Sequence, residues 1–102
     1  PFSAREKRLG ATCCVDMHGP VTELTAEDGR TAKFAFDSSF WSHDDFYADE
    51  SGYCHPNQFS KYADQRHVFD TFGKRVLDNA WAGYHTCLFA YGQTGAGKSY
   101  SM

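Results

Sequence analysis

The stretch Gly92-Gln93-Thr94-Gly95-Ala96-Gly97-Lys98-Ser99 decides the fold of this chain, because it has the Gly-x-x-x-x-Gly-Lys-Ser spacing of a phosphate-binding P-loop. Its glycines leave backbone N–H groups open to an anion and permit the unusual backbone angles of a tight curve. A helix should begin at Lys98, and its unpaired N–H groups and dipole would face the same anion. The pattern predicts that the whole stretch binds a nucleoside triphosphate, with Lys98 on the β and γ phosphates and the Ser99 hydroxyl on Mg²⁺.

A nearly continuous apolar run, Tyr84 to Tyr91, precedes this loop. Because both faces of the run are apolar, it is interpreted as a buried strand of a parallel sheet. The order of strand, Gly-rich turn and helix start predicts an α/β P-loop NTPase fold with a central, mostly parallel sheet. A chance match is the alternative, but ordinary usage of about 7% Gly makes the expected number of such matches well below roughly one in a hundred.

An amphipathic helix is predicted upstream of that run, beginning after Asp64 and ending near Gly83. Its apolar residues recur at spacings of three and four: Val68, Phe69, Phe72, Val76, Leu77, Ala80 and Trp81. Asp64 can act as the N-cap, and Gly83 lies where a C-cap is expected. Gly73 inside the helix costs about 1 kcal/mol relative to Ala, which indicates either a weak helix there or a neighbour that approaches closely.

Three short strands are predicted in the N-terminal half, at Thr12 to Met17, Val21 to Thr25 and Thr31 to Phe36. The dipeptides Gly19-Pro20 and Asp28-Gly29 separate them, and both are turn formers. Strands joined by such short turns pair with their neighbours in the sequence. The N-terminal half is therefore expected to form a small antiparallel meander.

Two segments show no regular period. Residues 1–10 are polar and basic, and they are interpreted as a loop or a short exposed turn. Residues 37–62 mix Ser, Asp, Gly and His with scattered aromatics, which predicts a long loop anchored by Phe40, Trp41 and Phe46.

The cysteines and histidines do not have the spacing of a metal site. Cys54-His55, with His43 and His67 at a distance, matches no structural zinc pattern, so these are interpreted as surface polar residues. The four cysteines show no CxxC spacing, which favours reduced thiols in a cytosolic protein.

Charge and composition limit the partners that the chain can have. The 102 residues carry a net charge of -3, so they lack the basic field that draws a protein onto nucleic acid or an anionic membrane. No apolar run approaches the roughly 20 residues that span a bilayer, and no signal pattern is present. The start at Pro1, and the end at Met102 inside the first turn of a predicted helix, indicate a chain that is truncated at both ends.

The chain resembles a kinesin motor domain, and the resemblance is strongest at Phe89 to Met102, which reads FAYGQTGAGKSYSM. The chain also resembles the family's first helix and its exit toward the P-loop strand, at Val68-Phe69, Val76-Leu77, Ala80 and Gly83-Tyr84. The chain further resembles the third kinesin class, which transports vesicles and organelles, at Trp41-Ser42-His43, Ala63-Asp64-Gln65 and Ser99-Tyr100. The resemblance covers residues 1–102 as the N-terminal part of a motor domain.

This resemblance implies an ATPase that uses ATP and Mg²⁺ to move along microtubules. It implies that Tyr100 packs against the adenine and that Pro1 borders the base, although only the Pro of the family's Arg-x-Arg-Pro stretch is present. His85 stands where the family usually has Asn, and Ser99 stands where Thr is more common. The protein is expected to be cytoplasmic and associated with the cytoskeleton, and to bind microtubules through parts outside this sequence.

The isolated chain is not expected to hydrolyse ATP at a useful rate. Phosphoryl transfer depends on several groups that position and stabilise charge together, and the two switch regions of the family are not among residues 1–102. Two alternatives stay open. One is a different P-loop NTPase, such as a nucleotide kinase or a nucleic-acid-stimulated ATPase, and the other is a truncated product that is non-motile or regulatory.

Overall fold

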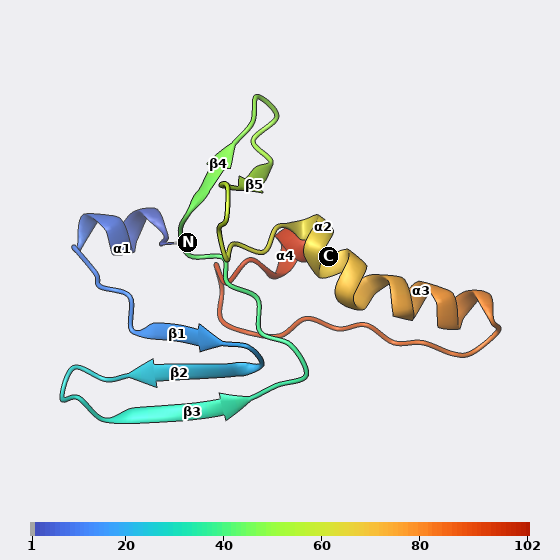
Figure 1. The fold of residues 1–102 in the computed structure, drawn as a ribbon, viewed down its shortest axis with the longest axis horizontal. Coiled ribbons are helices and arrows are strands. Elements are labelled where there is room, and N and C mark those ends of the chain that lie inside the picture. The colour runs from blue at the N-terminus through green and yellow to red at the C-terminus, as the bar shows by residue number, and fades with distance from the viewer. Residues whose placement is uncertain (1) are drawn as a thin grey trace. The chain divides into compact units, whose positions relative to one another are not determined.

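The computed structural model describes residues 2–102, which form two compact units, one that ends at Tyr62 and one that runs from Ala63 to Met102 (Figure 1). The expected contact of Pro1 with a nucleotide base lies outside the described residues.

The first unit opens with helix α1, Ala4–Arg8, where the sequence predicted a loop or turn. Ser3 and Glu6 form a capping box, in which the Glu6 N–H donates to Ser3 Oγ (3.3 Å) and the Ser3 N–H donates to Glu6 Oε2 (2.7 Å). The hydrogen bond with the Ser3 side chain is the largest cause that lowers the pKa of Glu6. The loop prediction was wrong because a local cap, and not an apolar period, forms this short helix.

The predicted meander is confirmed. An antiparallel sheet in the order β1-β2-β3 is formed by β1 (Val15–His18), β2 (Val21–Thr25) and β3 (Thr31–Ala35) (Figure 1). Gly19 (φ 59°) and Gly29 (φ 81°) take positive backbone angles at the two connecting turns. Residues with a Cβ rarely adopt such angles, which explains the glycine in each turn.

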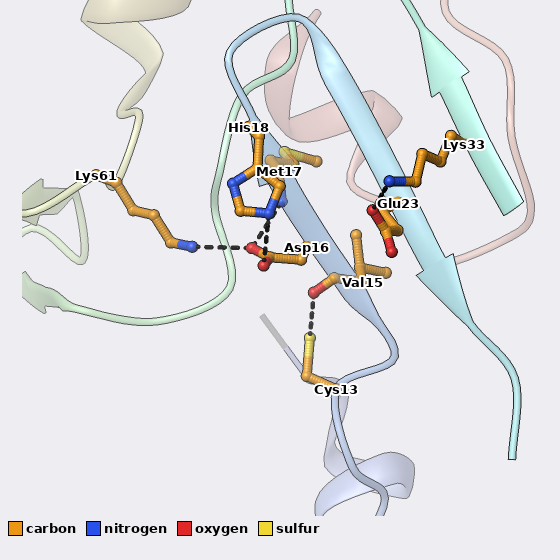
Figure 2. Close-up of polar contacts among 8 residues, drawn as sticks. All are labelled: Cys13, Val15, Asp16, Met17, His18, Glu23, Lys33 and Lys61. Atoms are coloured by element: carbon orange, nitrogen blue, oxygen red, sulfur yellow. Dashed lines mark hydrogen bonds and ion pairs between the residues drawn. The ribbon is translucent and has the colours of Figure 1, made fainter. Parts of the chain in front are cut away.

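Asp16 on β1 contacts two cationic or potentially cationic side chains (Figure 2). Its carboxylate accepts a hydrogen bond from Lys61 Nζ at 3.3 Å and lies 3.0 Å from His18 Nε2. The Met17 N–H also donates to it at 2.8 Å, and this bond is the largest cause that lowers the pKa of Asp16. Because Lys61 Nζ lies 3.8 Å from the centroid of the Trp41 ring, the lysine connects β1 with Trp41.

Trp41 is the one buried apolar side chain in the part of the chain that the structure describes, with 9% of its surface exposed. Its indole Nε1 donates to Asp44 at 2.7 Å, and its backbone forms a bridge to Tyr62. Phe46 packs against Tyr62 with 4.8 Å between ring centroids. Trp41 and Phe46 thus anchor this segment as predicted, and Phe40 is half-buried.

Residues 37–62 are not the continuous loop that the sequence predicted, because β4 (Phe46–Ala48) and β5 (Cys54–Pro56) pair as an antiparallel hairpin (Figure 1). Asp49 organises its turn: one carboxylate oxygen accepts from the Ser51 hydroxyl (2.6 Å), the Ser51 N–H (2.9 Å) and the Tyr53 N–H (3.0 Å). The hydrogen bond from the Ser51 side chain is the largest cause that lowers the pKa of Asp49. Strands of three residues are too short to show an alternating pattern in the sequence.

The second unit contains the predicted helix in three consecutive segments, α2 (Gln65–Val68), the π-helical η1 (Phe69–Gly73) and α3 (Lys74–Trp81) (Figure 1). Asp64 is its N-cap, as predicted, and accepts a hydrogen bond from the His67 N–H at 2.7 Å. Gly83 follows the helix with a φ of 88°, which is the left-handed angle of a C-cap glycine.

The π-helical turn explains Gly73. The Lys74 N–H donates to Phe69 O, five residues earlier, which places the Phe69 ring over Gly73. A Cβ at position 73 would lie 2.8 Å from Phe69 Cδ2, which is closer than two non-bonded carbon atoms approach each other. Of the two interpretations of Gly73 that the sequence left open, the close neighbour is therefore the right one.

The prediction of a strand over Tyr84 to Tyr91 was wrong for this structure, where the segment is extended but not paired. No strand among residues 2–102 pairs with it, and its aromatic side chains are exposed, for example Phe89 (75%) and Tyr91 (85%). A strand is defined by hydrogen bonds to a neighbouring strand. An apolar run that has no such neighbour therefore does not form part of a parallel sheet. The strand pairs within the described sheets are antiparallel. None of the described helices is both long enough and apolar enough to cross a membrane.

Candidate phosphate-binding site

Three glycines shape the loop between residue 91 and helix α4, Lys98–Ser101. Gly92, Gly95 and Gly97 have φ angles of 143°, 85° and 85°, and all three fall in the region that disfavours side chains. A Cβ at Gly95 or Gly97 would meet no atom within 4 Å, so the backbone angle alone requires these glycines. The Ala96 N–H donates to Gln93 O at 3.2 Å and closes the turn.

The N-terminus of α4 follows the last of these glycines directly. Gly97 is its N-cap in the left-handed conformation, and no side chain caps the helix. The N–H groups of Tyr100 and Ser101 donate back to Gly97 O, at 3.0 and 3.2 Å. The N–H groups of Lys98 and Ser99 have no carbonyl within the helix to donate to, which leaves them available to an anion.

Lys98 lies against the inner side of the loop. Its Nζ donates to Gly92 O at 2.8 Å and to Gln93 O at 2.7 Å. These two bonds close the loop as a ring through the lysine side chain and hold one positive charge at its centre. An ammonium group carries three donors and exchanges neutral carbonyls readily for phosphate oxygens, because hydrogen bonds between charged groups are the stronger ones.

The other predicted site residues adjoin this loop to different extents. Ser99 is exposed one residue after Lys98, and Tyr100 presents its ring at 58% exposure. Gln65 Nε2 donates to Ser101 Oγ at 3.3 Å, which connects α2 with α4. No feature of the sequence signals that last contact, since the two residues are far apart in the chain.

The donor set at this loop suits Mg²⁺ better than a soft metal. Within the described residues no group of three or more His, Cys, Asp or Glu side chains could hold an ion, and the four cysteines are free thiols. Mg²⁺ is usually held by one or two protein oxygens together with phosphate oxygens and water. The exposed hydroxyl of Ser99, next to the glycine-rich loop, is an oxygen of this kind.

Comparisons with known proteins match the whole chain. The family described as "Kinesin motor domain" matches residues 1–102. Kinesin-like protein KIF28 of Rattus norvegicus is 49% identical over 105 residues, which cover 100% of this chain and 10% of that protein. The solved structure of KIF14 with ADP in complex with a microtubule superposes with a TM-score of 0.76 at 44% identity and covers 98% of this chain. That of a KIF14 dimer with AMP-PNP, in a two-heads-bound state on a microtubule, gives a TM-score of 0.78.

The matches also fix how much of a family member is present. The chain spans 25% of the KIF14 chain solved with ADP and 24% of the one solved with AMP-PNP. The resemblance of fold and sequence is nevertheless continuous from one end of the chain to the other, and it includes the glycine-rich loop. The fold is that of a kinesin-type P-loop NTPase, and the chain belongs to the kinesin motor-domain family.

Proposed function

We propose that this chain supplies the phosphate-binding loop with which a microtubule motor holds ATP and Mg²⁺. The observation that carries the proposal is the position of Lys98, whose ammonium is bonded to two carbonyls of the glycine-rich loop. A lysine that pointed into solvent would have made the motif an accident of composition. The KIF14 structures contain ADP and AMP-PNP, which supports a nucleotide as the ligand.

Each loop residue has a proposed task. Lys98 exchanges its bonds with Gly92 O and Gln93 O for the β and γ phosphate oxygens, and the N–H groups of Lys98 and Ser99 donate to the same oxygens. Ser99 Oγ holds Mg²⁺, which when bound neutralises charge on the phosphates. Tyr100 packs its exposed ring against the adenine.

The wider function of the parent protein is proposed from the family. The parent is a microtubule-stimulated ATPase that moves along microtubules in the cytoplasm, and it contacts tubulin through segments outside residues 1–102. The KIF14 structures on microtubules support this partner. The third, organelle-transporting class stays a prediction, as do the roles of Pro1 and Tyr100.

A non-motile or regulatory product is the second candidate. In both candidates the glycine-rich loop binds nucleotide. They differ in whether the parent protein uses the bound nucleotide for movement. The other alternative, an unrelated P-loop NTPase, is removed by the family match over the whole chain.

Substitution of Lys98 tests the proposal. In a motor domain that contains this chain, Lys98→Ala is expected to weaken ADP affinity by about tenfold or more, because hydrogen bonds to charged groups contribute roughly 1.5–3 kcal/mol. Titration with a fluorescent ADP analogue measures the change. Lys74→Ala is the matched control, since it removes an exposed lysine of α3 that is not part of the glycine-rich loop. Equal affinity of the Lys98→Ala and Lys74→Ala proteins would exclude a phosphate-binding role.

A further inference from the structure

Phe59 has two properties that the fold itself does not require. Its side chain is 98% exposed, more than any other large apolar side chain in the described part of the protein. Its backbone has a φ of 62°, in the left-handed region that a bulky residue rarely adopts. Because the ring is exposed, it adds no hydrophobic stabilisation to the fold of the described residues. The left-handed backbone angle costs free energy, and no burial of the ring offsets that cost.

The surrounding loop nevertheless holds Phe59 in one conformation. Asp45, the other non-glycine residue with a positive φ (63°) among those described, lies at the base of the β4–β5 hairpin, next to Phe46, which pairs with Pro56. Asp45 O accepts from the Asn57 N–H (3.1 Å) and from Ser60 Oγ (2.7 Å), and Asp45 Oδ1 accepts from Asn57 Nδ2 (2.9 Å). The Ser60 N–H donates to Asn57 O at 3.1 Å. These bonds fix residues 57–60, which we call the Phe59 loop.

Two carboxylates directly before β4, those of Asp44 and Asp45, have neutral hydrogen-bond partners. The carboxylate of Asp44 accepts from the Trp41 indole, and that of Asp45 accepts from the Asn57 amide, so both partners are neutral donors. Lys61 is the one lysine or arginine in residues 37–62, and it pairs with Asp16 on the meander. The same stretch contains five carboxylates: Asp37, Asp44, Asp45, Asp49 and Glu50.

We propose that the Phe59 loop is a docking site for a protein partner that offers an apolar pocket rimmed by Lys and Arg side chains. The exposed ring fills the pocket, and the carboxylates of Asp44 and Asp45 face the basic rim. Aromatic side chains at the centre of an interface commonly dominate its binding energy. Because hydrogen bonds to Asn57 and Ser60 already hold the loop, less conformational entropy is lost on binding than for a loop without such bonds. This surface is distinct from the glycine-rich loop, and the inference does not depend on nucleotide binding.

A defined peptide probe tests the partner chemistry. A random peptide library displayed on phage is selected against a motor domain that contains this chain and is depleted on the Phe59→Asn variant. Asn tolerates the left-handed angle, so this variant removes the ring without straining the backbone. The expected enriched peptides combine apolar residues with Lys or Arg. Their synthetic versions should bind the Phe59→Asn protein about tenfold more weakly or worse. Asp44→Asn keeps an acceptor for the Trp41 indole and removes the charge. It should lower affinity severalfold, an effect that disappears at high salt.

Five results would overturn the proposal. Enriched peptides that are acidic, or that bind the Phe59→Asn protein equally well, would exclude this surface or this chemistry, as would a failure to enrich any peptide. A dimer in sedimentation that depends on Phe59 would make a second copy of the chain the occupant. A melting temperature that falls by several degrees in Phe59→Asn would make the ring a folding contact, whereas an unchanged or higher value is expected.

Discussion

Gly73 is the residue where an ordinary helix rule and this structure give opposite predictions. In an exposed helix, Gly→Ala should stabilise by about 1 kcal/mol. Here the added Cβ would lie 2.8 Å from Phe69 Cδ2, and the ring must move to accept it. We expect Gly73→Ala to lower the free energy of unfolding by roughly 1 kcal/mol or more, because overpacking outweighs the gain in helix propensity. Urea denaturation of the motor domain measures the difference.

The control for Gly73 is a second change on the same turn. Phe69→Ala removes the ring, so adding Gly73→Ala to it should restore the ordinary stabilisation of a helical alanine. If Gly73→Ala were stabilising in the presence of Phe69, the close contact between ring and backbone would not be what selects glycine at this position.

At the same scale, the phosphate-binding residues were predictable from the sequence and the hairpin residues were not. The Gly and Lys positions of the P-loop follow from short-range requirements on backbone angle and charge, and residues 92–99 carry those requirements in order. The role of Asp49 depends on hydrogen bonds from residues two and four positions later, which become specific only once the turn has formed. An Asp followed by Glu, Ser and Gly is equally compatible with an open loop.

The β4–β5 hairpin is the element whose stability should depend on acid. Its turn is organised by Asp49, whose pKa lies below its usual value chiefly because the Ser51 hydroxyl donates to the carboxylate. A carboxyl group with a lowered folded pKa contributes stability above its unfolded pKa of about 3.9, and this contribution is lost as the pH falls toward the folded value. We expect the hairpin to keep its form from neutral pH to about pH 4 and to loosen below that.

Amide chemical shifts of Tyr47 and Tyr53, followed by NMR during an acid titration, report on this element. In Asp49→Asn the transition should be absent, and the hairpin should be less ordered already at neutral pH. An unaltered titration in that variant would mean that another carboxyl group controls the turn.

A helix forms from contacts within its own segment, whereas a strand also needs a partner from elsewhere in the chain. This difference explains why some elements were predicted correctly from the sequence and others were not. The helix from Gln65 to Trp81 was predictable because its cap at Asp64 and its apolar period lie within the segment itself. The π-helical turn inside it was not predictable, since the sequence marks it by one glycine only. Residues 84–91 have the composition of a buried strand, yet a strand also needs partners, and the described residues provide none beside it.

The molecule as a whole has far more apolar surface than its own elements cover. Sixteen large apolar side chains are exposed, whereas Trp41 alone is buried among the described residues. In the second unit the exposed set includes one face of the helix and the segment before the glycine-rich loop, at Phe69, Phe72, Leu77, Trp81, Tyr84, Leu88, Phe89 and Tyr91. Hydrophobic burial is the main favourable contribution to folding. Because so much apolar surface stays exposed, we expect burial within the 102 residues alone to offset little more than the loss of chain entropy.

The isolated 102-residue chain is therefore expected to unfold without a cooperative transition and to show no microtubule-stimulated ATP turnover. Circular dichroism during heating and a phosphate-release assay with and without microtubules measure the two properties, with a complete motor domain that contains the chain as the control. A sharp melting transition of the isolated chain would show that the meander, the hairpin and the helix stabilise one another sufficiently. Microtubule-stimulated turnover by the isolated chain would be the stronger contradiction, because it would place every group needed for phosphoryl transfer within residues 1–102.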